Sequence, residues 1–153
     1  MNPDKKVLVT GGRGFIGVNL ARAISPSKTT EVLDNLKRAS PTGWDQELST
    51  LREGDILNPE FVTGCCGGTS QVVHLAAYGS VVESIADPER NFEVNVQGTL
   101  NMLRAAVDAG VRRFIFASTG GALIGDATPA GHRTCIINCS DYSVVDVYER
   151  SWS

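Results

Sequence analysis

Short runs of apolar residues, each closed by glycine, proline or polar residues, recur along the chain as far as residue 117. Runs of this kind are typical of strands that are buried on both faces of a parallel sheet. The pattern therefore predicts five strands, which occupy or end at residues 6–10, 31–34, 51–55, 71–75 and 114–117.

Between these strands the apolar positions follow the spacing of helices. The first helix is predicted over residues 15–24, with an apolar face made of Phe15, Ile16, Leu20, Ala23 and Ile24. A short helix begins at Asn58-Pro59, where proline suits the first helical position, and residues 64–68 predict a turn. A long helix is predicted from about Asp87 to Ala109, and Gly110 is its expected left-handed stop.

Strands that alternate with helices form a parallel sheet covered on both faces, so the predicted fold class is α/β with a doubly wound sheet. The sheet is expected to stop after about the fifth strand, because the alternation ends near residue 128. We therefore expect one domain over residues 1–128 and an atypical tail over 129–153 that forms no separate domain. Within the tail, Ile136-Ile137 and Val144-Val145 are the candidates for an edge strand.

The composition fits one globular domain, because 42% of the 153 residues are hydrophobic and 20% are charged. A net charge of -3 argues against a nucleic-acid partner that is recognised through a large basic face. No apolar run approaches the ~20 residues that span a bilayer, and the first residues do not have the pattern of a signal peptide. We therefore expect a cytoplasmic protein with neither a nucleic-acid nor a membrane partner.

The cysteines are Cys65, Cys66, Cys135 and Cys139, which are too few for a small disulfide scaffold and are expected to be reduced thiols. Zinc usually takes four ligands from two close pairs. His132 lies near the last two cysteines, but the sequence offers no second close pair beside them. No metal site is therefore expected.

Gly11, Gly14 and Gly17 follow the first predicted strand and open the first helix. In this arrangement the first glycine permits a tight turn, the second lets a pyrophosphate approach the backbone, and the third permits close packing of the helix on the sheet. The helix N-terminus also offers unpaired N–H groups to phosphates. The pattern predicts a Rossmann-type dinucleotide site, and a tight turn without a ligand is the alternative.

Asp34 ends the second predicted strand, about 20 residues after the glycine loop, where a carboxylate accepts hydrogen bonds from a ribose diol. A carboxylate at this position repels a 2′-phosphate, so NAD is favoured over NADP as the cofactor. Lys37 and Arg38 follow closely and would soften this preference.

Six motifs occur in one order along the chain: Thr10-Gly-Gly-Arg-Gly-Phe-Ile-Gly17, Val32-Leu-Asp-Asn-Leu36, Gly54-Asp-Ile56, Val73-His-Leu-Ala-Ala77, Asn95-Val-Gln-Gly-Thr99 and Phe116-Ala-Ser-Thr119. Their order and spacing resemble those of extended short-chain dehydrogenases/reductases. The resemblance is strongest to the nucleotide-sugar epimerase/dehydratase group, to which UDP-glucose 4-epimerase belongs, and covers about residues 5–128.

The resemblance implies an NAD site and its residues. Those expected to bind NAD are Gly11, Gly14, Phe15, Ile16, Gly17, Asp34, Asn35, Asp55, Ile56, Leu75, Ala76 and Ala77. In the family the acid of the Gly-Asp-Ile motif, here Asp55, sits at the adenine; a helix-capping or turn carboxylate is the alternative. The small residues after the fourth strand would let the cofactor pass close to the backbone.

Other polar residues near the fourth strand have structural interpretations. His74 lies within the strand and is expected to be a core histidine rather than a ligand. Asn95 resembles the asparagine that ties a helix to the sheet in this family. Tyr78 and Ser80 follow the strand and are expected to belong to an ordinary surface loop, and a place at the edge of the substrate side is the alternative.

The resemblance also implies catalytic residues. In the family a serine or threonine after the fifth strand bonds the sugar hydroxyl that is oxidised, which makes Thr119 the first candidate and Ser118 the second. A tyrosine with a lysine four residues on completes the family pattern. Tyr142 stands about where that tyrosine falls, but Asp146 takes the place of the lysine, and a carboxylate there would raise the pKa of the phenol.

Several hypotheses follow for the chain as a whole. Full-length members of the family continue into a second half, so residues 129–153 belong either to a truncated or frame-shifted copy or to a short protein with a new C-terminus. The chain is an enzyme that acts on a sugar nucleotide through NAD, a non-catalytic NAD-binding module, or an interaction module that associates with a full-length relative. An open edge at the fifth strand predicts homo-oligomers or association with such a relative.

Overall fold

The computed structural model describes residues 6–39, 47, 49–118 and 135–137. The elements in chain order are β1 (Lys6–Thr10), α1 (Phe15–Ile24), β2 (Thr29–Asp34), β3 (Thr50–Glu53), α2 (Pro59–Cys66), β4 (Gln71–His74), α3 (Val81–Ala86), α4 (Pro88–Phe92), the π-helix η2 (Glu93–Gly98), α5 (Thr99–Asp108), β5 (Arg113–Phe116) and β6 (Cys135–Ile137). All five strands that the apolar runs predicted are present within about two residues of the expected bounds.

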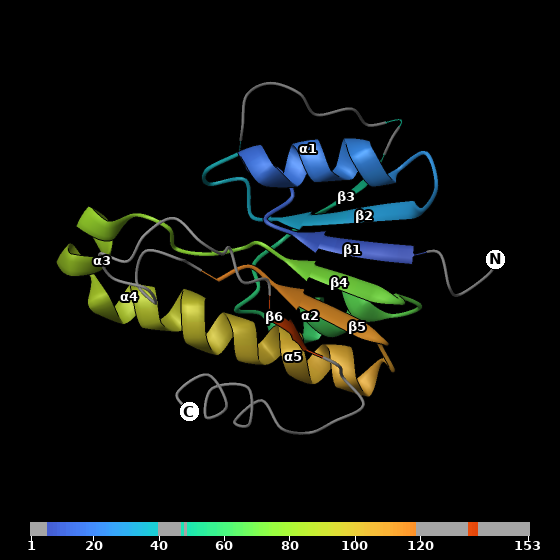
Figure 1. Cartoon of the computed structure of the whole chain (residues 1–153). Helices are drawn as coiled ribbons and strands as arrows, with labels where there is room; N and C mark the ends of the chain where they lie inside the picture. Colours follow the sequence, from blue (N-terminus) through green and yellow to red (C-terminus); the bar gives the residue numbers. More distant parts are fainter. Residues whose placement is uncertain (1–5, 40–46, 48, 119–134, 138–153) are drawn as a thin grey trace, which may run out of the picture.

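The strands form one sheet in the order β3-β2-β1-β4-β5-β6, as Figure 1 shows. The pairs from β3 to β5 are parallel, and β6 pairs with β5 in the antiparallel direction. Helices lie on both faces, which confirms the doubly wound α/β fold. The strand order reverses between β1 and β4, and open sheets of this kind bind their ligands at such a point.

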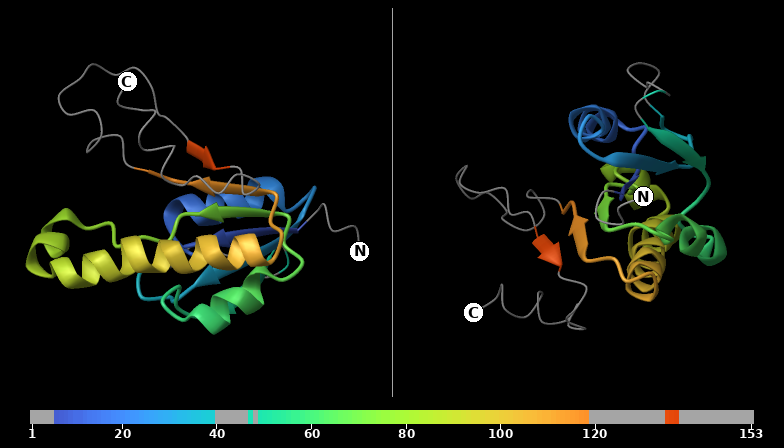
Figure 2. Two further views of the ribbon diagram at one scale, coloured as in Figure 1. Left: turned by 90° about the horizontal axis from the view of Figure 1, so that it is seen from below. Right: turned by 90° about the vertical axis from the view of Figure 1, so that its right-hand side faces the viewer.

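The outer edge of β5 is occupied by β6, which is drawn beside it in Figure 2. This strand includes Ile136-Ile137, one of the two candidate edge strands in the tail. The other candidate, Val144-Val145, lies outside the described residues, as does the boundary expected at residue 128. The expectation that β5 has an open outer edge therefore does not hold for the described part of the chain.

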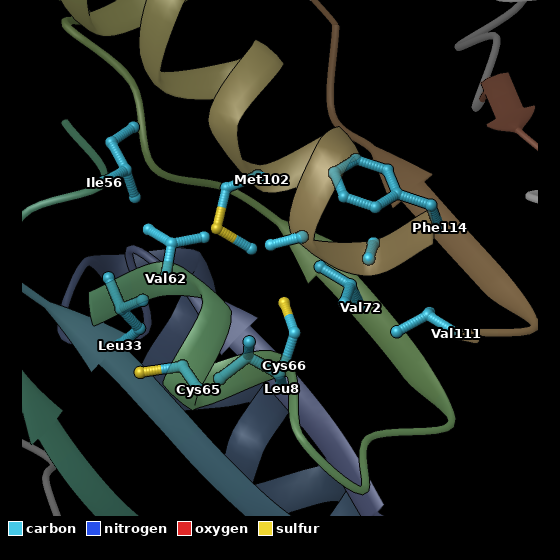
Figure 3. Packing of buried hydrophobic residues seen from close by; sticks show 12 residues of the cluster. Leu8, Leu33, Ile56, Val62, Cys65, Cys66, Val72, Met102, Val111 and Phe114 are labelled. Atoms are coloured by element: carbon cyan, nitrogen blue, oxygen red, sulfur yellow. The ribbon is translucent and has the colours of Figure 1, made fainter. Parts of the chain in front are cut away.

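The strands supply two hydrophobic layers, one on each face of the sheet. The smaller layer packs Ala21 of α1 against Val7, Val9 and Val32 of the sheet. The larger layer packs the sheet against α2 and α5, and Figure 3 shows its side chains converging; it contains Leu8, Leu33, Ile56, Val62, Cys65, Cys66, Val72, Met102, Ala105, Ala106, Val111 and Phe114. Cys65 and Cys66 are buried thiols in this layer, as expected for that pair.

The buried face of α1 differs from the predicted one. Gly17, Val18 and Ala21 are its buried residues, whereas Phe15 is 81% exposed and Ile16 is 64% exposed. These two residues lie in the first turn of the helix, at the glycine loop, where both side chains are exposed. The prediction placed them in the core because their spacing fits a helical face, but that spacing says nothing about where along its length a helix meets the sheet.

The long helix predicted from Asp87 to Ala109 is interrupted. Residues 88–108 run as α4, the π-helix η2 and α5, and Gly110 stops the run with a φ of 69° as expected. The separate short helix α3 was not predicted. The turn predicted at residues 64–68 is shorter than expected, because α2 continues to Cys66.

Among the residues that the structure describes, no helix is both long and apolar enough to cross a membrane.

Candidate functional site

The glycine loop joins β1 to α1 at the carboxyl edge of the sheet. Gly11 has a φ of 64°, and a Cβ added there would lie 2.7 Å from the Ala76 nitrogen, so the loop touches the chain that leaves β4. A Cβ on Gly17 would lie 2.4 Å from the Gly12 Cα. Gly17 therefore permits close packing of α1 on the loop, and not on the sheet as predicted.

Gly14 differs from the other two glycines because the space beside it is open. An added Cβ would meet only the Gly11 oxygen, at 3.2 Å. Gly14 is the N-cap of α1 and supplies no side-chain cap. The first N–H groups of a helix have no intrahelical partner, so the backbone N–H groups of the first turn, where Phe15 and Ile16 lie, suit an anionic ligand.

Asp34 ends β2 and holds the loop in place. One carboxylate oxygen, Oδ2, accepts a hydrogen bond from the Arg13 N–H at 2.9 Å, and Oδ1 accepts one from the Leu36 N–H at 2.8 Å. Leu36 has a φ of 61°, which turns the chain sharply after the strand. Asp34 is largely buried but borders the cleft. Because each carboxylate oxygen can accept a second hydrogen bond, Asp34 can still accept from a ribose diol.

Asp55 follows β3, and its carboxylate lies close to one backbone N–H group and three side-chain nitrogens. Its Oδ1 accepts from the Leu57 N–H at 3.1 Å, and its Oδ2 accepts from the Asn35 side-chain amide at 3.3 Å. The Lys37 Nζ lies 3.9 Å from Oδ2, and an Arg90 nitrogen lies 3.6 Å from it. Asn35 thus acts here by orienting Asp55, and the turn-carboxylate alternative also holds in part, because Asp55 caps its own turn.

A buried hydrogen-bond chain runs from β1 through β4 to the π-helix. Thr99 donates its hydroxyl proton to the Asn95 carbonyl at 2.8 Å, so it must accept from His74 Nε2 at 3.0 Å. Nε2 therefore carries the ring proton, and Nδ1 accepts the Thr10 hydroxyl proton at 2.7 Å. Thr10 Oγ1 in turn accepts from the N–H groups of the two residues after His74, each at 3.2 Å.

This chain explains His74, which is buried in the core as expected. Burial lowers the pKa of His74 to about 4, so the ring stays neutral near neutral pH. The neutral ring fixes the backbone that leaves β4 and thereby positions the cleft wall made by Leu75, Ala76 and Ala77.

Asn95 ties the π-helix to the segment after β4, whereas the resemblance implied a tie to the sheet itself. Its side chain accepts from the Tyr78 N–H at 2.8 Å and donates to the Tyr78 carbonyl at 3.3 Å. It also donates to the Asn91 side chain at 2.7 Å. A π-helical turn within a longer helix often marks a functional region, and here it brings the amide of Asn95 to the backbone beside the cleft.

These elements surround an open cleft at the point where the strand order reverses. Its lining residues are Gly11, Gly14, Leu33, Asp34, Asn35, Lys37, Arg38, Gly54, Asp55, Ile56, Leu75, Ala76, Ala77, Tyr78, Arg90 and Val94. Most of the expected cofactor residues are therefore brought together. Phe15, Ile16 and Gly17 are not in the lining, because the first two point outward and the third is buried in the loop.

Of the candidate catalytic residues, the structure describes only Ser118. Ser118 is exposed, two residues beyond β5, and does not line the cleft. Thr119 and Tyr142 lie outside the described residues.

Arg90 and Val94 are cleft residues that the sequence did not indicate. Tyr78 also lines the cleft, although an ordinary surface loop was the favoured interpretation for it. Ser80 is also more than a loop residue, because its hydroxyl caps α3 by accepting from the Glu83 N–H at 3.3 Å. A serine three residues before a glutamate is the capping-box signal that could have revealed α3.

The sheet order, the glycine loop and the carboxylate at the end of β2 define a Rossmann-type dinucleotide-binding domain. The model of the NAD dependent epimerase/dehydratase family matches residues 7–148. The chain therefore belongs to this family, whose cofactor is NAD, as expected. The match extends to residue 148, beyond residues 5–128 over which the sequence motifs carry the resemblance.

Individual relatives show the same similarity. The chain is 37% identical over 118 residues to a UDP-glucose 4-epimerase of Streptomyces lividans, covering 74% of this chain and 36% of the relative. It is 35% identical over 124 residues to a 3-beta-hydroxysteroid dehydrogenase of Mycolicibacterium neoaurum, covering 78% of this chain and 33% of the relative.

Among solved structures, the NAD complex of the UDP-glucose 4-epimerase from Thermus thermophilus matches with a TM-score of 0.73 and 31% identity. The match covers 96% of this chain and 50% of that chain. The chain thus spans about a third of the length of these curated relatives and about half of this solved structure.

Proposed function

We propose that this chain binds NAD in the cleft between the glycine loop, Asp34 and Asp55. The observation that carries the proposal is the placement of Asp34. Its carboxylate holds the glycine loop and borders the same cleft as Gly11 and Gly14. A pyrophosphate at the N-terminus of α1 and a ribose diol at Asp34 would satisfy both groups together.

Asp55 and Ile56 are the proposed neighbours of the adenine. Ile56 borders the cleft and is covered on its other side by Gly98, where an added Cβ would lie 2.6 Å from the Ile56 side chain. Gly98 therefore lets the helical run pack close behind the adenine wall. The small side chains of Ala76 and Ala77 leave room for the cofactor opposite Asp34.

We further propose that the protein to which this cofactor-binding part belongs acts on a nucleotide sugar. When bound, NAD would accept a hydride from the carbon of a sugar hydroxyl. The similarity to UDP-glucose 4-epimerases supports this substrate class. Within the chain, Thr119 is the proposed partner of that hydroxyl, with Ser118 as the alternate.

A non-catalytic dinucleotide-binding module, which could associate with a full-length relative, is the second candidate function. The observation that favours it is Asp146, four residues after Tyr142, where the family pattern has lysine. A carboxylate disfavours the tyrosinate that would act as the base, since like charges raise the pKa of the phenol. On this proposal the chain holds NAD and turns over no substrate.

Thermal unfolding of the 153-residue chain with increasing NAD tests cofactor binding directly. At 100 times the dissociation constant, a ligand specific for the folded state adds ~2.7 kcal/mol, which raises the Tm of a chain of this size by roughly 5–10 °C. ADP-ribose, which lacks the nicotinamide, should produce a similar shift because the cleft contacts lie on the adenosine side. No shift with either compound would refute the proposal.

Turnover distinguishes the two candidate functions once NAD binding is shown. The chain is incubated with NAD and UDP-glucose or UDP-galactose, and the products are separated by chromatography. Interconversion of the two sugars supports the enzyme. A Tm shift with NAD but no product supports the binding module.

A further inference from the structure

Three cations border the cleft beside Asp34, namely Lys37, Arg38 and Arg90. A cluster of this kind next to an adenosine ribose is the usual requirement for NADP, because an arginine near the ribose accommodates the 2′-phosphate. The carboxylate of Asp34 favours NAD instead. Cofactor choice therefore depends on whether these cations are available to a phosphate.

Each cation already has an anionic neighbour. Asp55 lies 3.9 Å from Lys37 and 3.6 Å from Arg90, and it belongs to the cleft itself. Arg90 is also 2.9 Å from Glu93. Arg38 forms its ion pair with Glu83 of α3, which does not border the cleft.

An aromatic ring and two local turns fix the Arg38–Glu83 ion pair in position. The guanidinium carbon of Arg38 lies 5.5 Å from the centre of the Tyr78 ring, within the range of a cation–π interaction. The left-handed Leu36, held by Asp34, fixes the turn two residues before Arg38. Glu83 is placed by the capping hydroxyl of Ser80.

We propose that Glu83 is a specificity-determining residue for the cofactor. By pairing with Arg38 it withholds the guanidinium from the 2′-phosphate of NADP, and it thereby preserves the preference for NAD that Asp34 establishes. Arginine binds phosphate through two parallel hydrogen bonds, so a released Arg38 would favour NADP. This inference rests on the proposed function, because it applies to a chain that binds NAD.

The test compares NAD and NADP binding to the wild-type chain and to Glu83→Gln by isothermal titration calorimetry at physiological salt. Both groups of the pair are partly exposed, so its contribution is modest. Glu83→Gln should tighten NADP binding about threefold to tenfold while NAD binding changes by less than about twofold. Glu89→Gln, an equal charge change at an exposed position of α4, is the matched control and should leave the NAD/NADP ratio unchanged.

A double variant shows whether the effect passes through Arg38. Glu83→Gln combined with Arg38→Met should lose the gain in NADP affinity and return to the wild-type preference. A gain that persists in the double variant, or equal changes for NAD and NADP in Glu83→Gln, would overturn the role of Glu83 while leaving NAD binding intact. A chain that binds neither nucleotide in any variant would refute the proposed function and this inference with it.

Discussion

Gly14 and Gly17 stand three residues apart, but a methyl group would meet different surroundings at each. At Gly14 the nearest atom is a carbonyl oxygen at 3.2 Å and the rest of the space is open. At Gly17 the nearest atoms are backbone atoms of the loop, at 2.4 Å and beyond, which cannot move without moving α1. The first glycine therefore keeps room for a ligand, and the second is required for the folded loop.

This difference predicts opposite effects for two alanine substitutions. Gly14→Ala should leave the free energy of unfolding within about 1 kcal/mol of the wild-type value and weaken NAD binding at least about tenfold, since a Cβ obstructs the pyrophosphate. Gly17→Ala should destabilise the fold by about 1–3 kcal/mol through overpacking. Urea unfolding and NAD titration of both variants measure the two effects. Wild-type NAD affinity in Gly14→Ala would contradict the placement of the pyrophosphate.

The carboxylates of the cleft also act first on the protein itself. Asp34 holds the glycine loop and the turn at Leu36, and Asp55 caps its own turn and receives Asn35. Both keep acceptor capacity toward the cleft. The site is therefore formed before any ligand arrives, so binding needs little ordering of these side chains.

At the scale of elements, the chain of hydrogen bonds through His74 connects β1, β4 and the π-helix. The strands on either side of the cleft are thus joined beneath it by side chains as well as by the sheet. His74 Nδ1 must remain an acceptor for this connection. Protonation of the ring would place a second donor against the Thr10 hydroxyl and a charge in the core.

This connection predicts a loss of stability in mild acid. Burial lowers the folded-state pKa of His74 from 6.5 to about 4, so between these values the unfolded state binds more protons than the folded state. The contribution of the neutral His74 to the free energy of unfolding is fully present above about pH 6.5 and is lost as the pH falls toward 4. The expected loss is about 3 kcal/mol.

Urea unfolding across this pH range measures the loss. The matched control is His132→Gln, because His132 is the other histidine of the chain, and this variant should keep the same pH dependence. A free energy of unfolding that stays constant between pH 6.5 and pH 5 would contradict a neutral, buried His74.

At the scale of the whole molecule, large apolar side chains remain exposed along the helical run after β4. Phe92 is 60% exposed and Val96 is 50% exposed, and Leu100 follows at the same spacing of four residues. Val82 and Ile85 of α3 are also exposed. Exposed apolar side chains that gather on one element are typical of interaction surfaces.

We predict that copies of the chain associate through this surface. The sequence predicted association through an open edge of β5, but β6 occupies that edge. The exposed apolar side chains of the helices are therefore the basis of this prediction. The combined substitution Phe92→Glu and Val96→Glu should shift the chain toward monomer without unfolding it, since both side chains are at least half exposed. Sedimentation velocity over a range of concentrations measures the change, and Asn19→Glu at an exposed position of α1 is the control. A wild-type chain that is monomeric at every concentration would refute this prediction.

The sequence by itself determined the strands, the first helix and the glycine loop. Each of these depends on residues that are close along the chain: apolar runs for buried strands, glycines at a spacing of three, and Asp34 at the end of its strand. Local sterics and local burial are sufficient to specify them. The family resemblance then predicted which of these residues border the proposed NAD site.

Only the tertiary structure decided which distant residues meet across the cleft. Arg38 and Glu83 are 45 positions apart, and Asp55, which follows β3, meets Arg90 of α4. The exposure of Phe15 and the bond from Asn95 to Tyr78 likewise depend on where a helix ends relative to the sheet. Periodicity reports which residues share a face, whereas contacts between elements depend on how the whole chain packs, and that arrangement sets the charges around the cofactor site.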